Sequence, residues 1–183
     1  MMTEPAARSL RLPPGSLRAL HQALARGHDP VESATLLREI GYEMGDVFYD
    51  ALEEALAQAP EESLRSLPPE RFWSGCSAFF EQHGWGGLRW AKLHPAVAAL
   101  DSPDWIESEE RREPHPACHL TTGLLAKLLS RAAGGDIAVL EVECRARGNE
   151  RCRFLFGGPE ALDLLYREIR AGTSYTAALA QLA

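Results

Sequence analysis

Four cysteines are the residues of this 183-residue chain whose type and spacing suggest chemistry. Cys118, Cys144 and Cys152 lie close together in the sequence, whereas Cys76 lies apart. Zinc binds thiolates in tetrahedral sites, with imidazole and carboxylate as common further ligands. The group of three therefore raises the hypothesis of a metal site. Two alternatives stay open at this point, namely three small buried residues or a disulfide that joins Cys144 to Cys152.

A fourth ligand would complete a tetrahedral site. Strict alternation along a strand would send Glu141 and Cys144 to opposite faces, so their joint use requires a twist or bulge near residues 142–144. On a helix, His119 would point about 100° away from Cys118, which directly precedes it. The residues alone do not decide among the candidates, which are His115, His119, Glu141 and Glu143.

A predicted hairpin would bring two of the thiols together. Residues 137–142 are rich in apolar and β-branched types and predict a strand, and residues 151–156 are predicted as its partner, with Gly148-Asn149 near the turn. Antiparallel pairing of the two strands places Cys144 close to Cys152.

Helical spacing of apolar residues predicts most of the remaining elements. One helix opens at His115-Pro116 and carries Cys118 in its first turn, where the helix dipole favours a thiolate. A long helix follows the cap Asp29, and its Gly41 and Gly45 would let another backbone approach closely. Further helices are predicted at 16–27, at 69–83, from 159 and from 174, and further strands at 88–93, 96–100 and 105–109. This order predicts an α+β fold with a small, mostly antiparallel sheet flanked by helices.

The charge balance and the absence of long apolar runs narrow the classes of partner. The chain has 19 Lys+Arg against 26 Asp+Glu, a net charge of −7, which argues against a nucleic-acid surface. It has neither a membrane-spanning apolar stretch nor the layout of a signal peptide, so we expect a cytoplasmic protein with reduced thiols. Residues 1–15 are expected to form a flexible arm and residues 16–183 a single domain. The charge run at 107–113 predicts a solvated edge, and an exposed hairpin face is predicted for Arg145, Arg147, Arg151 and Arg153.

Aromatic side chains supply the candidate pocket for an apolar ligand. They gather on the predicted helix at 69–83 and in the segment after it, and an apolar cavity with a polar group is the usual form of a small-molecule site. Core packing is the alternative for each residue taken singly. The candidates are Phe72, Trp73, Cys76, Phe79, Phe80, His83, Trp85, Trp90 and Trp105.

The cysteine motifs resemble the 4-vinyl reductase-type ligand-binding domain. The resemblance rests on residues 115–125 (HPACHLTTGLL) and 139–154 (VLEVECRARGNERCRF). It comprises a Cys that leads a Gly-containing helix, then Glu-x-x-Cys, a Gly-containing loop and Cys-x-Phe. The family is similar in fold to nitric-oxide-signalling haem sensors and to small subunits of the Golgi-tethering TRAPP complex. The resemblance implies zinc held by Cys118, Glu141, Cys144 and Cys152.

The resemblance also implies a function. Some members are sensory domains of phenol- and toluene-responsive activators, so it implies binding of a hydrophobic or aromatic molecule, dimerisation and action through a separate effector protein. Other members accompany bacteriochlorophyll synthesis, which gives the alternatives of a tetrapyrrole accessory or carrier protein and of a dimeric scaffold that binds no small molecule. The chain has no Gly-x-Gly-x-x-Gly nucleotide loop, and three thiolates with a carboxylate leave no open metal position. The sequence therefore favours a binding protein with a structural zinc over an enzyme.

Overall fold

The structure is a computed structural model that describes residues 13, 15–57, 63–108 and 113–182. Most of the arm expected at residues 1–15 lies outside the described residues. The helices are α1 (Ser16–Gly27), α2 (Pro30–Leu56), α3 (Pro69–Gln82), α4 (His119–Ala133), α5 (Pro159–Arg170) and α6 (Tyr175–Leu179). The strands are β1 (Arg89–His94), β2 (Val97–Ser102), β3 (Ala138–Glu143) and β4 (Cys152–Gly157).

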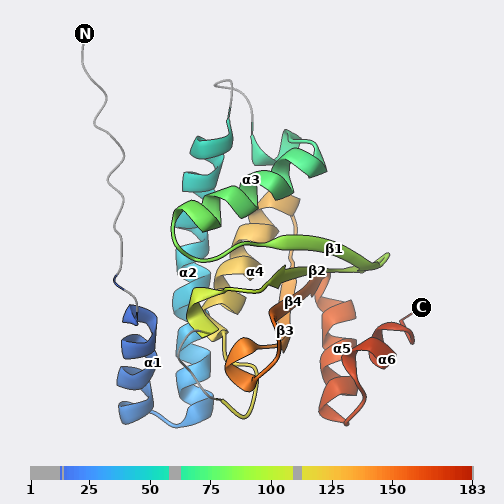
Figure 1. Cartoon of the computed structure of the whole chain (residues 1–183). Coiled ribbons are helices and arrows are strands. Elements are labelled where there is room, and N and C mark those ends of the chain that lie inside the picture. Colours follow the sequence, from blue (N-terminus) through green and yellow to red (C-terminus); the bar gives the residue numbers. More distant parts are fainter. Residues whose placement is uncertain (1–12, 14, 58–62, 109–112, 183) are drawn as a thin grey trace.

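The four strands form one antiparallel sheet in the order β1-β2-β4-β3, with helices on both faces. Helices α2, α3 and α4 lie on one side of the sheet and α5 and α6 on the other (Figure 1). Alternate residues of the paired central strands supply the two cores: Leu100 and Phe154 pack towards α2–α4, whereas Ala99 and Leu155 pack towards α5 and α6. The predicted α+β fold is therefore confirmed.

Helices α2 and α4 approach each other through glycines. The carboxylate of Asp29 caps α2 by accepting hydrogen bonds from two backbone N–H groups, as predicted. A Cβ atom added to Gly41 would lie 1.9 Å from the carbonyl oxygen of Leu120, and one added to Gly123 would lie 2.0 Å from that of Arg38. Because backbone faces backbone at these points, the separation of the two helices is fixed at the N-terminal end of α4.

Two predicted elements differ from the structure. The strand predicted at 105–109 is wrong, because residues Ile106–Ser108 form a 3-10 helix, η2. The helix predicted from His115-Pro116 begins only at His119, and Cys118 is its N-cap with non-helical backbone angles. The physical reason is that the backbone N–H of Cys118 binds the side chain of Glu141 and its thiol faces two other cysteines.

Candidate metal centre

Three loops or strand ends meet at a buried group of metal-binding side chains. Cys144 ends the β3 side of the hairpin and begins the 3-10 helix η3 (Arg145–Arg147), Cys152 begins β4, and Cys118 precedes α4. The Cys118 Sγ atom lies 3.8 Å from that of Cys144 and 3.9 Å from that of Cys152. With a carboxylate oxygen of Glu141, the ligand atoms all lie within 4.8 Å of one another, and all four residues are buried. We call these four residues the Cys3Glu cluster.

A β-bulge brings Glu141 to the thiols. The pairing of β3 with β4 shifts register between Glu141, which is opposite Phe154, and Glu143, which is opposite Arg153. One additional residue on β3 therefore interrupts the alternation of side chains. This bulge is the irregularity that the joint use of Glu141 and Cys144 required.

One oxygen of Glu141 is buried without a hydrogen-bond partner. Its Oε2 atom accepts a hydrogen bond of 2.8 Å from the backbone N–H of Cys118, but Oε1 has no partner. A buried carboxylate oxygen in this state is costly unless a cation or a donor compensates it. His119 does not take this place, because its Nδ1 atom lies 3.4 Å from Arg38. The donor set of three sulfurs and one oxygen fits a thiophilic divalent ion such as zinc.

The protonation preferences of the cluster show the cost of leaving it without an ion. Burial raises the pKa of Glu141 and that of Cys118 well above their ordinary values. Hydrogen bonds from Cys118 and Cys144 lower the pKa of Cys152 to about 4, so this sulfur carries the negative charge. Without an ion, protons therefore neutralise most of the cluster. A divalent cation would replace those protons, and its affinity must fall as the pH falls.

Glu107 is a buried residue of this region that the sequence analysis misplaced. The run 107–113 was expected to be a solvated edge, but Glu107 is only 1% exposed, which corrects that expectation at this position. Its carboxylate accepts hydrogen bonds from the backbone N–H groups of Leu120 and Thr121 at the start of α4. Residues 109–112 lie outside the described part of the chain. Because the partners of Glu107 lie 13 and 14 residues away, no local spacing could have revealed its role.

Comparison with known proteins identifies the segment that contains this site. Residues 106–157, from η2 to the end of β4, match the family model of the 4-vinyl reductase domain. The chain carries a 4-vinyl reductase domain. This match includes all four residues of the Cys3Glu cluster, and it bears out the resemblance.

Three similar proteins extend the comparison beyond the matched segment. The bacteriochlorophyll synthase 23 kDa chain of Cereibacter sphaeroides is 27% identical over 155 residues, which are 82% of this chain and 72% of that protein. The crystal structure of the phenol-responsive sensory domain of the transcription activator PoxR has a TM-score of 0.65 at 17% identity, covering 84% of this chain and 78% of that one. A trafficking protein particle complex subunit 3 from Naegleria fowleri, covalently bound to palmitic acid, has a TM-score of 0.61 at 12% identity and covers 78% and 90%. At these identities the two structures establish a shared fold.

The aromatic residues of the 4-vinyl reductase-domain protein pack against one another beside the sheet. Phe72, Phe79, Phe80, Trp105 and Cys76 are buried in one core, and Trp85 packs on it. His83 contacts the ring of Phe79 and lies 2.8 Å from its carbonyl oxygen. At one end of this core the rings of Trp73 and Trp90 stack with centroids 6.0 Å apart, and Trp90 is 44% exposed. Use of these residues as a ligand pocket stays a prediction.

An open groove of the 4-vinyl reductase-domain protein lies elsewhere, on the outer side of α2 and α4. It has a volume of about 350 Å³ and a mainly apolar lining. Its lining residues include Tyr42 on α2, Gly123 on α4 and Val139 on β3. Among the described residues, no helix has both the length and the apolar character needed to cross a membrane.

The predicted exposed arginine face of the hairpin is only partly present. Arg147 is exposed, but Arg153 forms a bidentate ion pair with Asp101 at 2.6 and 2.7 Å. Arg151 pairs with Glu143 at 2.9 Å, and the hydroxyl of Tyr175 on α6 donates a hydrogen bond to that same carboxylate. The expectation is wrong for Arg151 and Arg153, because the neighbouring carboxylates draw their side chains onto the sheet.

The fourth cysteine of the 4-vinyl reductase-domain protein is predicted to be unreactive. Burial raises the pKa of Cys76 to about 12, so at pH 8 its thiolate fraction is about 1,000-fold below that of a thiol with its ordinary pKa near 9. We expect iodoacetamide at pH 8 to leave Cys76 unmodified in the folded protein and to modify it readily in urea, as read by peptide mass spectrometry. Rapid labelling of Cys76 under native conditions would contradict its placement in the core.

Proposed function

We propose that this protein is a small-molecule-binding module whose 4-vinyl reductase domain is held together by a structural zinc ion. The observation that carries the zinc proposal is the buried Cys3Glu cluster, in which Glu141 Oε1 has no partner. Three thiolates and one carboxylate would fill a tetrahedral coordination sphere, so the ion would have no open position for a substrate. Zinc would supply cross-linking of the β3–β4 hairpin to the start of α4 rather than catalysis.

The proposed ligand is a hydrophobic or aromatic molecule. The match to the 4-vinyl reductase family supports this choice, and so does the fold that the chain shares with the phenol-responsive domain of PoxR. The aromatic core between α3 and the sheet offers a suitable apolar surface, and its exposed end at Trp73 and Trp90 is the entrance we propose. We further propose that the protein works in the cytoplasm as a homodimer and passes its signal to a separate effector protein.

The zinc proposal predicts about one equivalent of zinc per chain. Protein expressed and purified without added metal is analysed by inductively coupled plasma mass spectrometry at neutral pH and again after stepwise acidification. We expect zinc to be released as the pH falls, because each ligand must be deprotonated to bind. A folded sample with less than a few tenths of an equivalent at neutral pH would contradict the proposal.

The ligand proposal is tested by isothermal titration with phenol, toluene and larger aromatic compounds. We expect Trp90→Ala to weaken binding of the best compound at least tenfold, because a stacking surface at the entrance is lost. Tyr166→Ala is the matched control, since Tyr166 is an exposed aromatic residue, 49% accessible, on α5 across the sheet. Equal effects of the two substitutions would reject the proposed entrance.

A second candidate function is an accessory or carrier role in tetrapyrrole synthesis. The 27% identity to the bacteriochlorophyll synthase 23 kDa chain favours it. Native mass spectrometry of freshly expressed protein separates the candidates, because it reports zinc, oligomeric state and any copurified ligand in one spectrum. A bound tetrapyrrole would favour the carrier, whereas a small aromatic molecule would favour the sensing module.

A further inference from the structure

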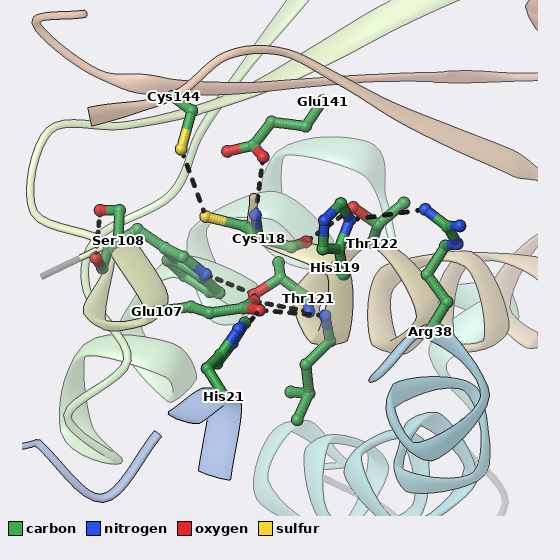
Figure 2. A network of polar contacts seen from close by, with 12 residues as sticks. His21, Arg38, Glu107, Ser108, Cys118, His119, Thr121, Thr122, Glu141 and Cys144 are labelled. Atoms are coloured by element: carbon green, nitrogen blue, oxygen red, sulfur yellow. Dashed lines mark hydrogen bonds and ion pairs between the residues drawn. The ribbon is translucent and has the colours of Figure 1, made fainter. Parts of the chain in front are cut away.

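We propose that Glu107 is a positioning residue of the metal centre and that it couples helix α1 to that centre through His21. The proposal rests on the proposed zinc site. It adds a residue that lies outside the Cys3Glu cluster and a helix that is remote from it in sequence. Figure 2 shows the contacts, which run from His21 through Glu107 to the first turn of α4 and so to Cys118.

The start of α4 lacks the side-chain cap that a helix normally has. The first N–H groups of a helix have no partner within it, and an N-cap side chain usually accepts hydrogen bonds from the second or third of them. Cys118 occupies the N-cap position of α4, but its side chain makes no such bond. Its thiol instead lies against Cys144 and Cys152.

Glu107 supplies the missing cap from another part of the chain. Its Oε1 atom accepts a hydrogen bond of 3.0 Å from the N–H of Leu120, and its Oε2 atom accepts one of 2.8 Å from the N–H of Thr121. These residues are the second and third of α4, whose N–H groups an N-cap side chain would bind. Because Glu107 satisfies them, the thiol of Cys118 is available to a metal ion.

The carboxylate of Glu107 is held firmly on its other sides. It also accepts a hydrogen bond from the hydroxyl of Thr121, which in turn accepts one of 2.7 Å from the indole N–H of Trp105. The Oγ atom of Ser108 donates to the carbonyl oxygen of Trp105 and closes η2. Glu107 therefore has little freedom to move, and neither does the first turn of α4.

His21 connects this carboxylate to α1. Its Nε2 atom lies 3.0 Å from Glu107 Oε1, and its side chain is 9% exposed while that of Glu107 is fully covered. No residue of α1 as a whole is buried, so apolar packing holds this helix only weakly. The His21–Glu107 contact must then contribute a large share of its attachment. Metal binding that orders the start of α4 would by linkage strengthen the docking of α1.

The first test compares zinc affinity in matched carboxylate variants. In Glu107→Gln one oxygen becomes an NH2 group that faces N–H donors, so we expect zinc affinity in a chelator competition to fall 10- to 100-fold, the usual effect of changing a group that orients a ligand. The Co²⁺-substituted protein should show altered thiolate-to-metal absorption bands. Glu53→Gln is the control, because Glu53 accepts hydrogen bonds from the Leu64 N–H and the Tyr49 hydroxyl at a site outside the cluster. It should keep wild-type zinc affinity even where it lowers the melting temperature.

The second test reads the coupling to α1. We expect hydrogen exchange of the α1 amides to become at least fivefold faster when zinc is removed from the wild type by chelation. His21→Ala should cause the same increase with zinc bound, and His21→Gln should restore part of the protection because its amide can donate to Glu107. If His21→Ala leaves exchange in α1 unchanged, or if zinc removal does, the coupling is refuted.

The outcomes separate this proposal from the zinc proposal. If the wild type binds zinc and Glu107→Gln binds it equally well with unchanged Co²⁺ spectra, the positioning role is wrong and the metal site stands. If the folded wild type binds no zinc, the proposed function itself fails. If Glu107→Gln does not fold, His21→Ala supplies the affinity measurement, and a loss of at least threefold is the expected result, whereas an unchanged affinity would overturn the proposal.

Discussion

Cys144→Ser will lower thermal stability far more than Cys76→Ser, although both residues are buried cysteines. Cys144 belongs to the Cys3Glu cluster, whereas Cys76 packs against apolar side chains. The binding of a structural zinc contributes on the order of 10 kcal/mol, which is comparable to the whole stability of a domain. We expect Cys144→Ser to lose the ion and to melt more than about 10 °C below the wild type, at ~2–4 °C per kcal/mol for this chain length.

The Cys76→Ser variant has a different and smaller cost. It places a hydroxyl in an apolar core, which costs about 1–3 kcal/mol when no hydrogen bond compensates it. A chelator separates the two effects, because it should lower the melting temperature of the wild type and of Cys76→Ser by equal amounts and that of Cys144→Ser hardly at all. Equal thermal shifts in the two variants, or a chelator effect that survives in Cys144→Ser, would contradict the metal site.

The hairpin shows how much of the site could be predicted from sequence. Strand-forming residues on both sides of a Gly-containing loop were sufficient to place Cys144 near Cys152. Residue alternation then identified the obstacle to using Glu141, and a bulge between Glu141 and Glu143 removes it. The need for a bulge is a local property of the sequence, but whether it forms depends on partners such as Cys118 that lie on another element.

The contacts that the sequence did not predict are the ones made across long separations. Glu107 stands in a run of charges that is normally exposed, and its burial depends on N–H groups of α4 and on His21, 86 residues earlier. The arginines of the hairpin were expected to face solvent, but Arg153 pairs with Asp101 on the neighbouring strand β2. The charge of a residue predicts exposure only when no complementary group lies opposite it, and single-sequence patterns do not contain that information.

Gly41→Ala will destabilise the protein even though alanine is the better helix former. Intrinsic propensity alone would favour alanine within a helix by about 1 kcal/mol. At Gly41, however, the new Cβ atom would lie 1.9 Å from the backbone carbonyl oxygen of Leu120, which cannot rotate away as a side chain would. We expect a loss of about 3 kcal/mol or more in the free energy of unfolding, measured by urea denaturation, because overpacking a tight contact forces the backbone to shift.

The same substitution should weaken metal binding, and this effect distinguishes a shift of α4 from a general loss of stability. Leu120 lies two residues after Cys118, so moving α4 away from α2 displaces a ligand of the Cys3Glu cluster. Gly27→Ala is the control, because nothing lies within 4 Å of a Cβ atom at that helical position. We expect Gly27→Ala to be neutral or slightly stabilising and to keep wild-type zinc affinity. If Gly41→Ala proved as stable as Gly27→Ala, the close backbone contact between α2 and α4 would be wrong, and with it the fixed position of Cys118.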